Sequence, residues 1–205
     1  MIKTIGIIGA GQMGNGIAHV CALAGYDIVI TDVSAPQVQK AMAVIDGNLD
    51  RQIGRGMITA DEKAEAMARI KPVGTLKELA NVDLAIEAVV EDEAVKRQVL
   101  MDLCPVLQPD ALIATNSSSI SITRLAAVTD RPEKFMGMHF MNPVPVMELV
   151  ELIRGIATDD HTFDLVREIV VKLGKTPANA EDFPAFIVNR ILMPMINEAI
   201  YTLYE

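Results

Sequence analysis

Short apolar runs, rich in β-branched residues, alternate along the chain with longer stretches whose apolar positions recur at helical spacing. The runs IKTIGIIG, DIVITD, VDLAIEAV and ALIATN predict strands, and residues 12–24, 35–54 and 92–107 predict the helices between them. Strands that alternate with helices are typical of βαβ units, in which helices cover both faces of a mainly parallel sheet. The pattern therefore predicts an α/β fold with a doubly wound sheet.

The segment 34–72 departs from a simple crossover between two strands. A long helix there has an apolar face and ends at two glycines, and Thr59-x-x-Glu62 forms the capping box of a shorter helix that returns toward the sheet. We therefore expect a helical hairpin, at about residues 35–70, that projects from the sheet. Polar residues near its tip form, taken alone, an ordinary solvated helix face. These residues are Asn48, Arg51 and Arg55.

The C-terminal part of the chain predicts a helix at about 159–173, an extended piece near KTPANAE and a last helix. Asp182 is the expected N-cap of this last helix, with Pro184 in its first turn. Apolar residues on more than one side of the helix indicate that it needs a packing partner. We expect an α/β domain at 1–183. At 184–205 we expect the first helix of a helical domain that is truncated in this chain, or a helix that packs against another molecule.

Composition and charge narrow the range of functions. The chain has 205 residues, of which 51% are hydrophobic, enough for a substantial core without disulfides. Its net charge of −9 disfavours nucleic-acid binding, which depends on a basic surface. No apolar run is long enough to span a membrane, and the N-terminal sequence lacks the apolar stretch of a signal peptide. Cys21 and Cys104 are expected to be free buried thiols, which favours a cytoplasmic location.

A glycine-rich loop, GAGQMG at residues 9–14, follows the first predicted strand and begins the first helix, and Asp32 ends the next strand. This context predicts a Rossmann-type domain, in which glycines permit a tight turn, a close approach to a pyrophosphate and close helix packing. Asp32 would bind the adenosine ribose, and an acid without an adjacent arginine favours NAD over NADP. The alternative is that the glycines serve packing alone. The predicted cofactor contacts of the loop are Gly9, Gly11, Gln12, Met13 and Gly14.

His139 is the best candidate for proton transfer, because a neutral imidazole suits that role near pH 7. It lies in the segment GMHFMNPVPVMELVE, where a reversal through Asn142-Pro143-Val144-Pro145 would bring Glu151 back to the imidazole. Such a carboxylate orients the ring and stabilises its charged form. The alternative for His139 alone is a hydrogen-bonded core histidine. His19 and His161 are expected to be surface or capping residues.

A run of hydroxyl side chains, TNSSS at residues 115–119, follows the strand ALIA. It therefore falls at the carboxyl end of the sheet, where α/β folds bind ligands. These serines could instead cap the helix that begins near Ile122. Ser121 is better placed for that cap, so Ser118 remains free to reach a substrate oxygen.

With GIIGAGQMGNGIA, Asp32, NSSS, GMHFMNPVPVMELVE and FIVNR in this order, the chain resembles the L-3-hydroxyacyl-CoA dehydrogenases, most closely their bacterial 3-hydroxybutyryl-CoA branch. The resemblance implies reversible, NAD-dependent oxidation of a short-chain (S)-3-hydroxyacyl-CoA, with no metal. It also implies a homodimer formed through a helical C-terminal domain, of which only the first helix is present here.

The resemblance assigns roles to individual residues. His139 would be the catalytic base and Glu151 its partner, with Ser118 and Asn189 at the reacting end of the substrate. The helical hairpin would hold coenzyme A, which gives Asn48, Arg51 and Arg55 a functional role. The residues expected near the nicotinamide are Glu91, Lys96, Ser118 and Asn142.

Two alternatives remain from the sequence. A β-hydroxyacid dehydrogenase of the 6-phosphogluconate type shares a GxGxMG start, but it relies on a lysine base in a later helix, where FIVNR presents Asn189. A non-catalytic NAD-binding or assembly module is the alternative outside the enzymes.

Overall fold

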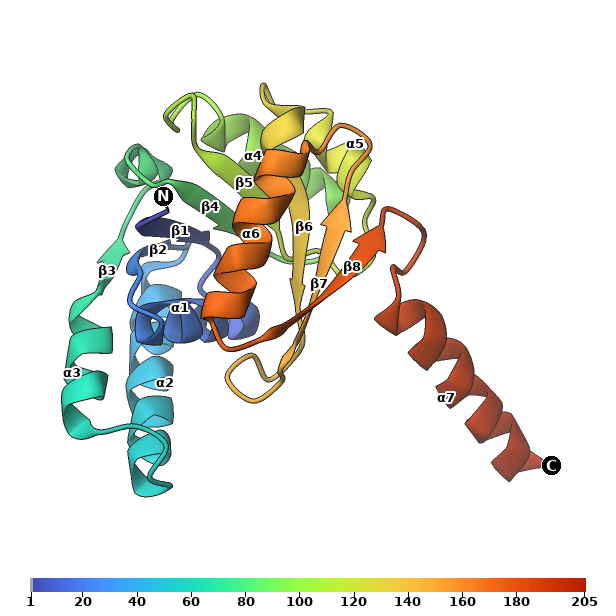
Figure 1. Cartoon of the computed structure of the whole chain (residues 1–205), viewed down its shortest axis with the longest axis horizontal. Coiled ribbons are helices and arrows are strands. Elements are labelled where there is room, and N and C mark those ends of the chain that lie inside the picture. Colours follow the sequence, from blue (N-terminus) through green and yellow to red (C-terminus); the bar gives the residue numbers. More distant parts are fainter. Residues whose placement is uncertain (1) are drawn as a thin grey trace.

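The computed structural model describes residues 2–205, which form a central sheet with helices on both faces and a helix that extends from one end (Figure 1). The strands follow in space as β3-β2-β1-β4-β5-β6-β7-β8, and every neighbouring pair is parallel except β6 and β7. The predicted doubly wound, mainly parallel sheet is confirmed. The strands are β1 (Thr4–Ile8), β2 (Asp27–Thr31), β3 (Ile70–Val73), β4 (Leu84–Glu87), β5 (Leu112–Thr115), β6 (Phe135–Phe140), β7 (Leu149–Arg154) and β8 (Thr176–Glu181).

The helices pack apolar side chains on the two faces of the sheet. One buried cluster joins the sheet to α1, α2 and α6, and a second joins it to α4 and α5. Because both faces are covered, the central strands read as near-continuous apolar runs and not as alternating ones. The helices are α1 (Gln12–Leu23), α2 (Ala35–Gly54), α3 (Ala60–Ala68), α4 (Glu93–Leu103), α5 (Ile122–Ala126), α6 (Asp160–Lys172) and α7 (Val188–Tyr204), with short 3₁₀ turns at Leu76–Leu79 and Pro132–Lys134.

The predicted hairpin is present as α2 and α3, which extend beyond the sheet in Figure 1. The capping box of α3 is formed: the Thr59 hydroxyl accepts the Glu62 amide, and the Glu62 carboxylate accepts the Thr59 amide. Lys63 of α3 lies 2.7 Å from Asp46 and 2.6 Å from Asp50 of α2, which ties the two helices together. The hairpin is therefore a braced extension of the first crossover.

Two predicted helix boundaries are wrong. The helix predicted at 92–107 ends at Leu103, because Pro105 lacks the amide hydrogen that would continue it. The last helix begins at Val188 and not beside Asp182. Ala185 and Phe186, with φ of 67° and 51°, turn the chain between Asp182 and the helix.

Asp182 caps a different helix from the one predicted. Its carboxylate accepts the amides of Ile122 and Thr123, at 2.9 and 2.8 Å, and the Ser121 hydroxyl at 2.7 Å. It lies just beyond β8, where the free amides at the start of α5 are within reach, and a carboxylate there also complements the helix dipole. The predicted capping role of Ser121 is confirmed, because its hydroxyl accepts the Arg124 amide.

Cys21 and Cys104 are buried and unpaired, as predicted. Within residues 2–205, none of the helices combines the length and apolar character needed to cross a bilayer.

The α7 helix buries none of its residues and extends away from the sheet (Figure 1). The division of the chain into domains at 183 and 184 stays a prediction.

Candidate active site

The glycine loop between β1 and α1 has the geometry that its spacing predicts. Gly9 has φ of +99°, and a Cβ there would lie 2.6 Å from the Ala88 carbonyl oxygen. A Cβ on Gly14 would lie 1.8 Å from the Gly9 carbonyl oxygen, so the helix packs directly on the turn. A Cβ on Gly11 would meet no atom within 4 Å. Two glycines thus shape the loop, and the third leaves the uncapped amino end of α1 open to an anion.

Asp32 follows β2 and closes the other side of this loop. Its carboxylate accepts the Ala10 amide at 2.8 Å and the Ser34 amide at 2.9 Å, so its position is fixed by backbone on both sides. A cavity of about 430 Å³ adjoins it, lined mainly by apolar residues and by no basic one. An apolar slot with one carboxylate at its rim fits an adenosine, whose ring is flat and whose ribose offers hydroxyl donors. The apolar wall includes Val33, Leu76, Val90 and Val95.

His139 and Glu151 meet as predicted. They are directly paired residues of the antiparallel strands β6 and β7, and Glu151 Oε2 lies 2.7 Å from His139 Nδ1. The side chain of Glu151 is fully buried, and that of His139 is nearly so. The second oxygen of Glu151 accepts the amides of Ile187 and Val188 at the start of α7, at 2.9 and 2.8 Å. One carboxylate therefore fixes both the imidazole and the amino end of a helix.

Opposing effects act on the pKa of Glu151. Burial alone would raise it, but the hydrogen bonds from His139 and from two backbone amides hold the pKa below its ordinary value. The carboxylate is therefore ionised at neutral pH, which is the form that can stabilise a charged imidazole. With Nδ1 engaged, Nε2 is the ring nitrogen left to exchange a proton with a ligand. The ring of Phe186 packs edge-on against His139, with centroids 6.1 Å apart.

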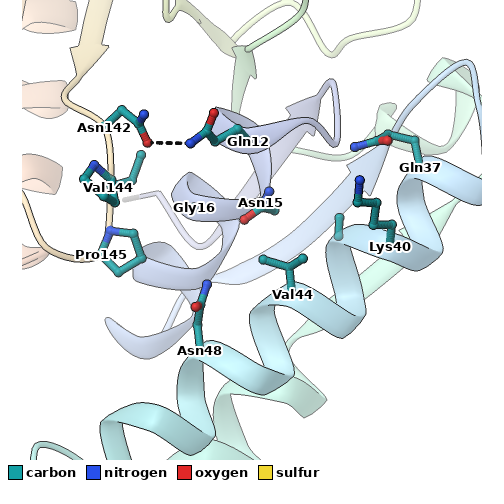
Figure 2. Close-up of a pocket in the computed structure, with 12 residues that line it drawn as sticks. Gln12, Asn15, Gly16, Gln37, Lys40, Val44, Asn48, Asn142, Val144 and Pro145 are labelled. Carbon is teal, nitrogen blue, oxygen red and sulfur yellow. Dashed lines mark hydrogen bonds between the residues drawn. The ribbon is translucent and has the colours of Figure 1, made fainter.

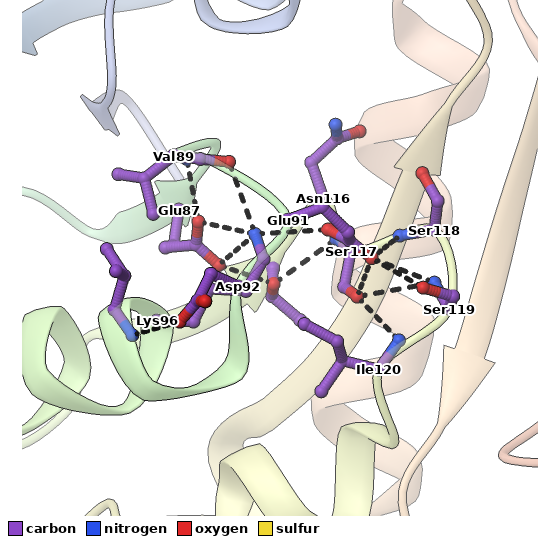
Figure 3. A network of polar contacts seen from close by, with 12 residues as sticks. Glu87, Val89, Glu91, Asp92, Lys96, Asn116, Ser117, Ser118, Ser119 and Ile120 are labelled. Carbon is purple, nitrogen blue, oxygen red and sulfur yellow. Dashed lines mark hydrogen bonds and ion pairs between the residues drawn. The ribbon is translucent and has the colours of Figure 1, made fainter.

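The serine-rich loop after β5 wraps around one carboxylate, that of Glu91 (Figure 3). Glu91 Oε1 accepts the Ser117 hydroxyl at 2.7 Å, the Ser118 amide at 2.7 Å and the Ser119 amide at 2.9 Å. The side chain amide of Asn189, at the start of α7, donates to the Ser118 carbonyl at 3.1 Å. Glu91, Ser118 and Asn189 thus lie together, as their predicted shared site requires.

Further hydrogen bonds join this loop to the rest of the site. Asn116 Oδ1 accepts the Phe140 amide at 2.9 Å, which links the serine loop to the strand of His139. Gln12 Nε2 donates to Asn142 Oδ1 at 3.0 Å, which links the glycine loop to the turn after β6. Asn116 was not predicted from the sequence, where its only signal was its place in TNSSS. The predicted cofactor and catalytic residues are therefore held in one connected framework.

Lys96 lies deeper than the predicted cofactor contact requires. Its side chain is 1% exposed, and its ammonium lies 2.8 Å from Glu87 and 3.5 Å from Glu91. The carboxylate of Glu91, by contrast, is 37% exposed. Glu87 was not predicted from the sequence, although a carboxylate inside the apolar run VDLAIEAV was a signal. Lys96 thus lies further from the surface than Glu91. A contact between Lys96 and NAD stays a prediction.

The predicted coenzyme A residues line a groove between α2 and the turn after β6. Asn48, Arg51 and Arg55 border a cavity of about 340 Å³ whose opposite wall is Pro143 and Pro145. A second cavity of about 290 Å³ shares Asn48 and both prolines and continues to the glycine loop (Figure 2). Arg51 donates to Asn48 within this groove. Lys40, which was not predicted from the sequence, also borders it.

The prediction for His19 is wrong. The residue is 1% exposed, and its Nε2 lies 3.0 Å from Gln52 Oε1 of α2, so it is neither a surface nor a capping residue. Its place on the inner face of α1, where the hairpin packs, explains the burial, which lowers its pKa. His161 is exposed near the start of α6, as predicted, and Asp159 provides the cap.

These features define the class of the protein: a parallel sheet with a glycine loop, an acid after the second strand and a histidine–carboxylate pair is the architecture of a dinucleotide-dependent dehydrogenase. The family model of the 3-hydroxyacyl-CoA dehydrogenase NAD binding domain matches residues 4–183. The chain belongs to this family. That membership decides against the 6-phosphogluconate-type alternative.

Relatives agree in sequence and in structure. The 3-hydroxybutyryl-CoA dehydrogenase of Bradyrhizobium diazoefficiens is 63% identical over the whole chain, which covers 70% of that protein. The crystal structure of (S)-3-hydroxybutyryl-CoA dehydrogenase from Ralstonia eutropha matches 97% of this chain and 70% of its own, at 49% identity and a TM-score of 0.95. The crystal structure of 3-hydroxybutyryl-CoA dehydrogenase from Escherichia coli matches the whole chain and 43% of its own, at 39% identity and a TM-score of 0.96.

Proposed function

We propose that this protein catalyses the reversible, NAD-dependent oxidation of (S)-3-hydroxybutyryl-CoA to acetoacetyl-CoA. The observation that carries the proposal is the buried His139–Glu151 pair, 2.7 Å apart, at the carboxyl edge of a dinucleotide-binding sheet. The substrate is that of relatives up to 63% identical.

The residues present fit NAD. Gly11 leaves space beside the uncapped amino end of α1, where amides can bind a pyrophosphate, and Asp32 lies at the rim of the adenosine slot. The candidates for the nicotinamide end are Glu91, Lys96, Ser118 and Asn142. When bound, NAD supplies the acceptor for a hydride from C3 of the substrate. Asp32 and the absence of basic residues from the slot favour NAD over NADP.

His139 is the proposed base. Its Nε2 takes the proton of the substrate hydroxyl during oxidation, and Glu151 stabilises the imidazolium that results. In the reverse direction the charged His139 returns this proton to the ketone oxygen. Ser118 and Asn189, which are hydrogen-bonded to each other, position that oxygen. Burial of the pair strengthens the interaction between carboxylate and imidazolium, because the local dielectric constant is low.

Coenzyme A is proposed to lie in the groove between α2 and the turn after β6. The groove presents Arg51, Arg55 and Asn48 in a chain whose net charge is −9, so its basic groups are a local feature. Arginine binds phosphate through paired hydrogen bonds, and coenzyme A carries three phosphate groups. The groove leads from the hairpin tip toward the glycine loop, which is the direction that a long pantetheine arm requires.

The domain division and assembly are also proposals. A boundary at 183 and 184 is supported by the family match, which ends at residue 183. A homodimer formed through a helical C-terminal domain is supported by the exposed apolar side chains of α7. Light scattering would test the second point, because a dimer in solution has twice the mass of a single copy.

The reaction is tested by the absorbance of NADH at 340 nm. Addition of acetoacetyl-CoA should oxidise NADH, while NADPH should be a poor substitute. Binding of NADH without turnover would contradict the proposal for this chain and favour a non-catalytic cofactor-binding module.

A further inference from the structure

A buried ion pair lies beneath the serine loop, at the point where the strand order reverses between β1 and β4 (Figure 3). Glu87 ends β4 and is fully buried, and Lys96 lies one turn into α4 and is 1% exposed. The Lys96 ammonium donates to both carboxylate oxygens of Glu87, at 2.8 and 3.0 Å. Both side chains are therefore withdrawn from solvent.

Stability does not explain such a pair. Withdrawing two charges from water costs several kcal/mol, and their attraction often only offsets this cost, so apolar residues of similar size would serve the fold as well. What apolar residues could not reproduce is the set of directed bonds that the two charged groups make.

Those bonds fix two loops. Glu87 accepts the Val89 amide at 2.7 Å, which holds the loop after β4, and the Thr115 hydroxyl at 2.6 Å, which holds the end of β5. Lys96 also donates to the Val89 carbonyl at 3.4 Å. Together with the two bonds from Lys96, each oxygen of Glu87 accepts two hydrogen bonds, and these fix the orientation of the carboxylate. The two loops are those that carry Glu91 and Ser118.

The pair reaches the ligand side through Glu91. Lys96 lies 3.5 Å from Glu91 Oε2, while Glu91 Oε1 is taken by the serine loop. Glu91 therefore connects the buried ammonium of Lys96 to the serine loop, which carries Ser118. Its pKa is lowered, because hydrogen bonds from Ser117 and the charge of Lys96 outweigh its burial.

We infer that Glu87 is a positioning residue: with Lys96 it fixes Glu91, and through Glu91 it sets the serine loop at the nicotinamide end of the cofactor site. The inference rests on the proposed function for the identity of that cofactor. Lys96 supports Glu91 in this arrangement, and the contact with NAD predicted for Lys96 is a separate prediction.

Three variants separate this role from a purely structural one. Glu87→Gln leaves Lys96 with only the more distant carboxylate of Glu91, and Lys96→Met leaves the buried Glu87 without a cation. Both variants should therefore lower the free energy of unfolding. The double variant removes both charges, and the amide that replaces the Glu87 carboxylate can still accept the Val89 amide and donate to Thr115. We therefore expect the double variant to regain most of the wild-type stability while Glu91 remains without its cation.

The deciding measurement is the dissociation constant of NADH, determined from its fluorescence at a temperature where all variants are folded. In Glu87→Gln, which keeps Lys96 and any contact that Lys96 makes with NAD, we expect NADH to bind roughly tenfold more weakly, the effect of losing one charge-assisted hydrogen bond. Glu93→Gln is the matched control, because Glu93 lies in the same helix but pairs with Arg124 outside the site. It should bind NADH as the wild type does.

Wild-type NADH affinity in folded Glu87→Gln would overturn the inference. If Glu87→Gln does not fold, Thr115→Val decides: it removes one hydrogen bond to Glu87 without changing charge, and unchanged NADH binding would then overturn the inference. Because these readouts measure binding, they are independent of whether the wild type turns over acetoacetyl-CoA, which tests the proposed function.

Discussion

Glu151 lies directly opposite His139 in the β6–β7 ladder and divides its two oxygens between the imidazole and the first amides of α7. The turn after β6 makes this pairing possible, because it reverses the chain between the two strands. The same carboxylate therefore orients the proposed base and fixes the helix that carries Asn189. A change at Glu151 should consequently affect both chemistry and stability, whereas a change at His139 should affect mainly chemistry.

His139→Gln should lower kcat by about 10² to 10⁴, the usual contribution of a general base. The dissociation constant of NADH should stay within about twofold of the wild-type value, since the glycine loop and the adenosine slot are untouched. Stopped-flow turnover and NADH fluorescence measure the two quantities. His161→Gln is the control, because His161 is exposed on α6 and should leave both unchanged. Full activity of His139→Gln would rule out the base assignment.

Glu151→Gln should lower kcat by roughly 10³, because a neutral amide no longer stabilises the imidazolium or selects its tautomer. It should also lower the free energy of unfolding at pH 7 by about 2 kcal/mol, since the carboxylate bonds at α7 are charge-assisted. The pKa of Glu151 in the folded protein lies below its ordinary value of 4.5. Its stabilising contribution is therefore present above pH 4.5 and is lost as the pH falls through the folded value.

Urea unfolding of wild type and Glu151→Gln at pH 7 and at about pH 3.5 measures this contribution. The difference between the two proteins should shrink at the lower pH. A difference that stays constant would mean that the carboxylate contributes through its shape and not through its charge.

Local patterns in the sequence were sufficient for the fold and for much of the site. The alternation of strands and helices, the glycine loop and the capping box at Thr59 are each set by neighbours in the chain, and all are found as predicted. The approach of His139 to Glu151 was also predictable, because a single turn with two prolines connects their strands.

The residues that were missed or misassigned are those whose partners lie far away in the chain. Asp182 has the sequence context of a helix cap but caps a helix that begins 60 residues earlier. His19 is covered by a hairpin that could not be placed from sequence. Glu87 was taken as part of an apolar strand, because the sequence does not show that Lys96 and Thr115 are its partners. Tertiary packing decides such contacts, and no local pattern encodes them.

Gly14→Ala and Gly11→Ala should fail in different ways. A Cβ at Gly14 would meet the Gly9 carbonyl oxygen at 1.8 Å, so the variant should lose about 3 kcal/mol of stability or not fold. A Cβ at Gly11 has free space, so that variant should unfold as the wild type does, but its methyl group should block the pyrophosphate. Thermal unfolding and NADH fluorescence distinguish the two. Unchanged NADH binding by Gly11→Ala would place the pyrophosphate elsewhere.

Lys175, the residue before β8, holds the turn after β6 in place through two hydrogen bonds. Removing its ammonium should affect substrate binding more than the rate of the chemical step. Its ammonium donates to the carbonyls of Val144 and Met147, each at 2.7 Å. Val144 also contacts α1 closely, since a Cβ on Gly16 would lie 2.8 Å from it, so these hydrogen bonds set one wall of the groove. Lys175→Met should lower the free energy of unfolding by about 2 kcal/mol, because both hydrogen bonds are charge-assisted.

In the kinetics, Lys175→Met should raise the KM for acetoacetyl-CoA severalfold and leave kcat within about twofold, because the β6–β7 ladder still holds His139 against Glu151. Lys71→Met is the matched control: Lys71 is exposed on the edge strand β3, away from the groove, and its loss should change neither value. Steady-state rates with varied acetoacetyl-CoA at saturating NADH measure both constants. A fall in kcat with an unchanged KM would show that the turn supports the catalytic pair and not the groove.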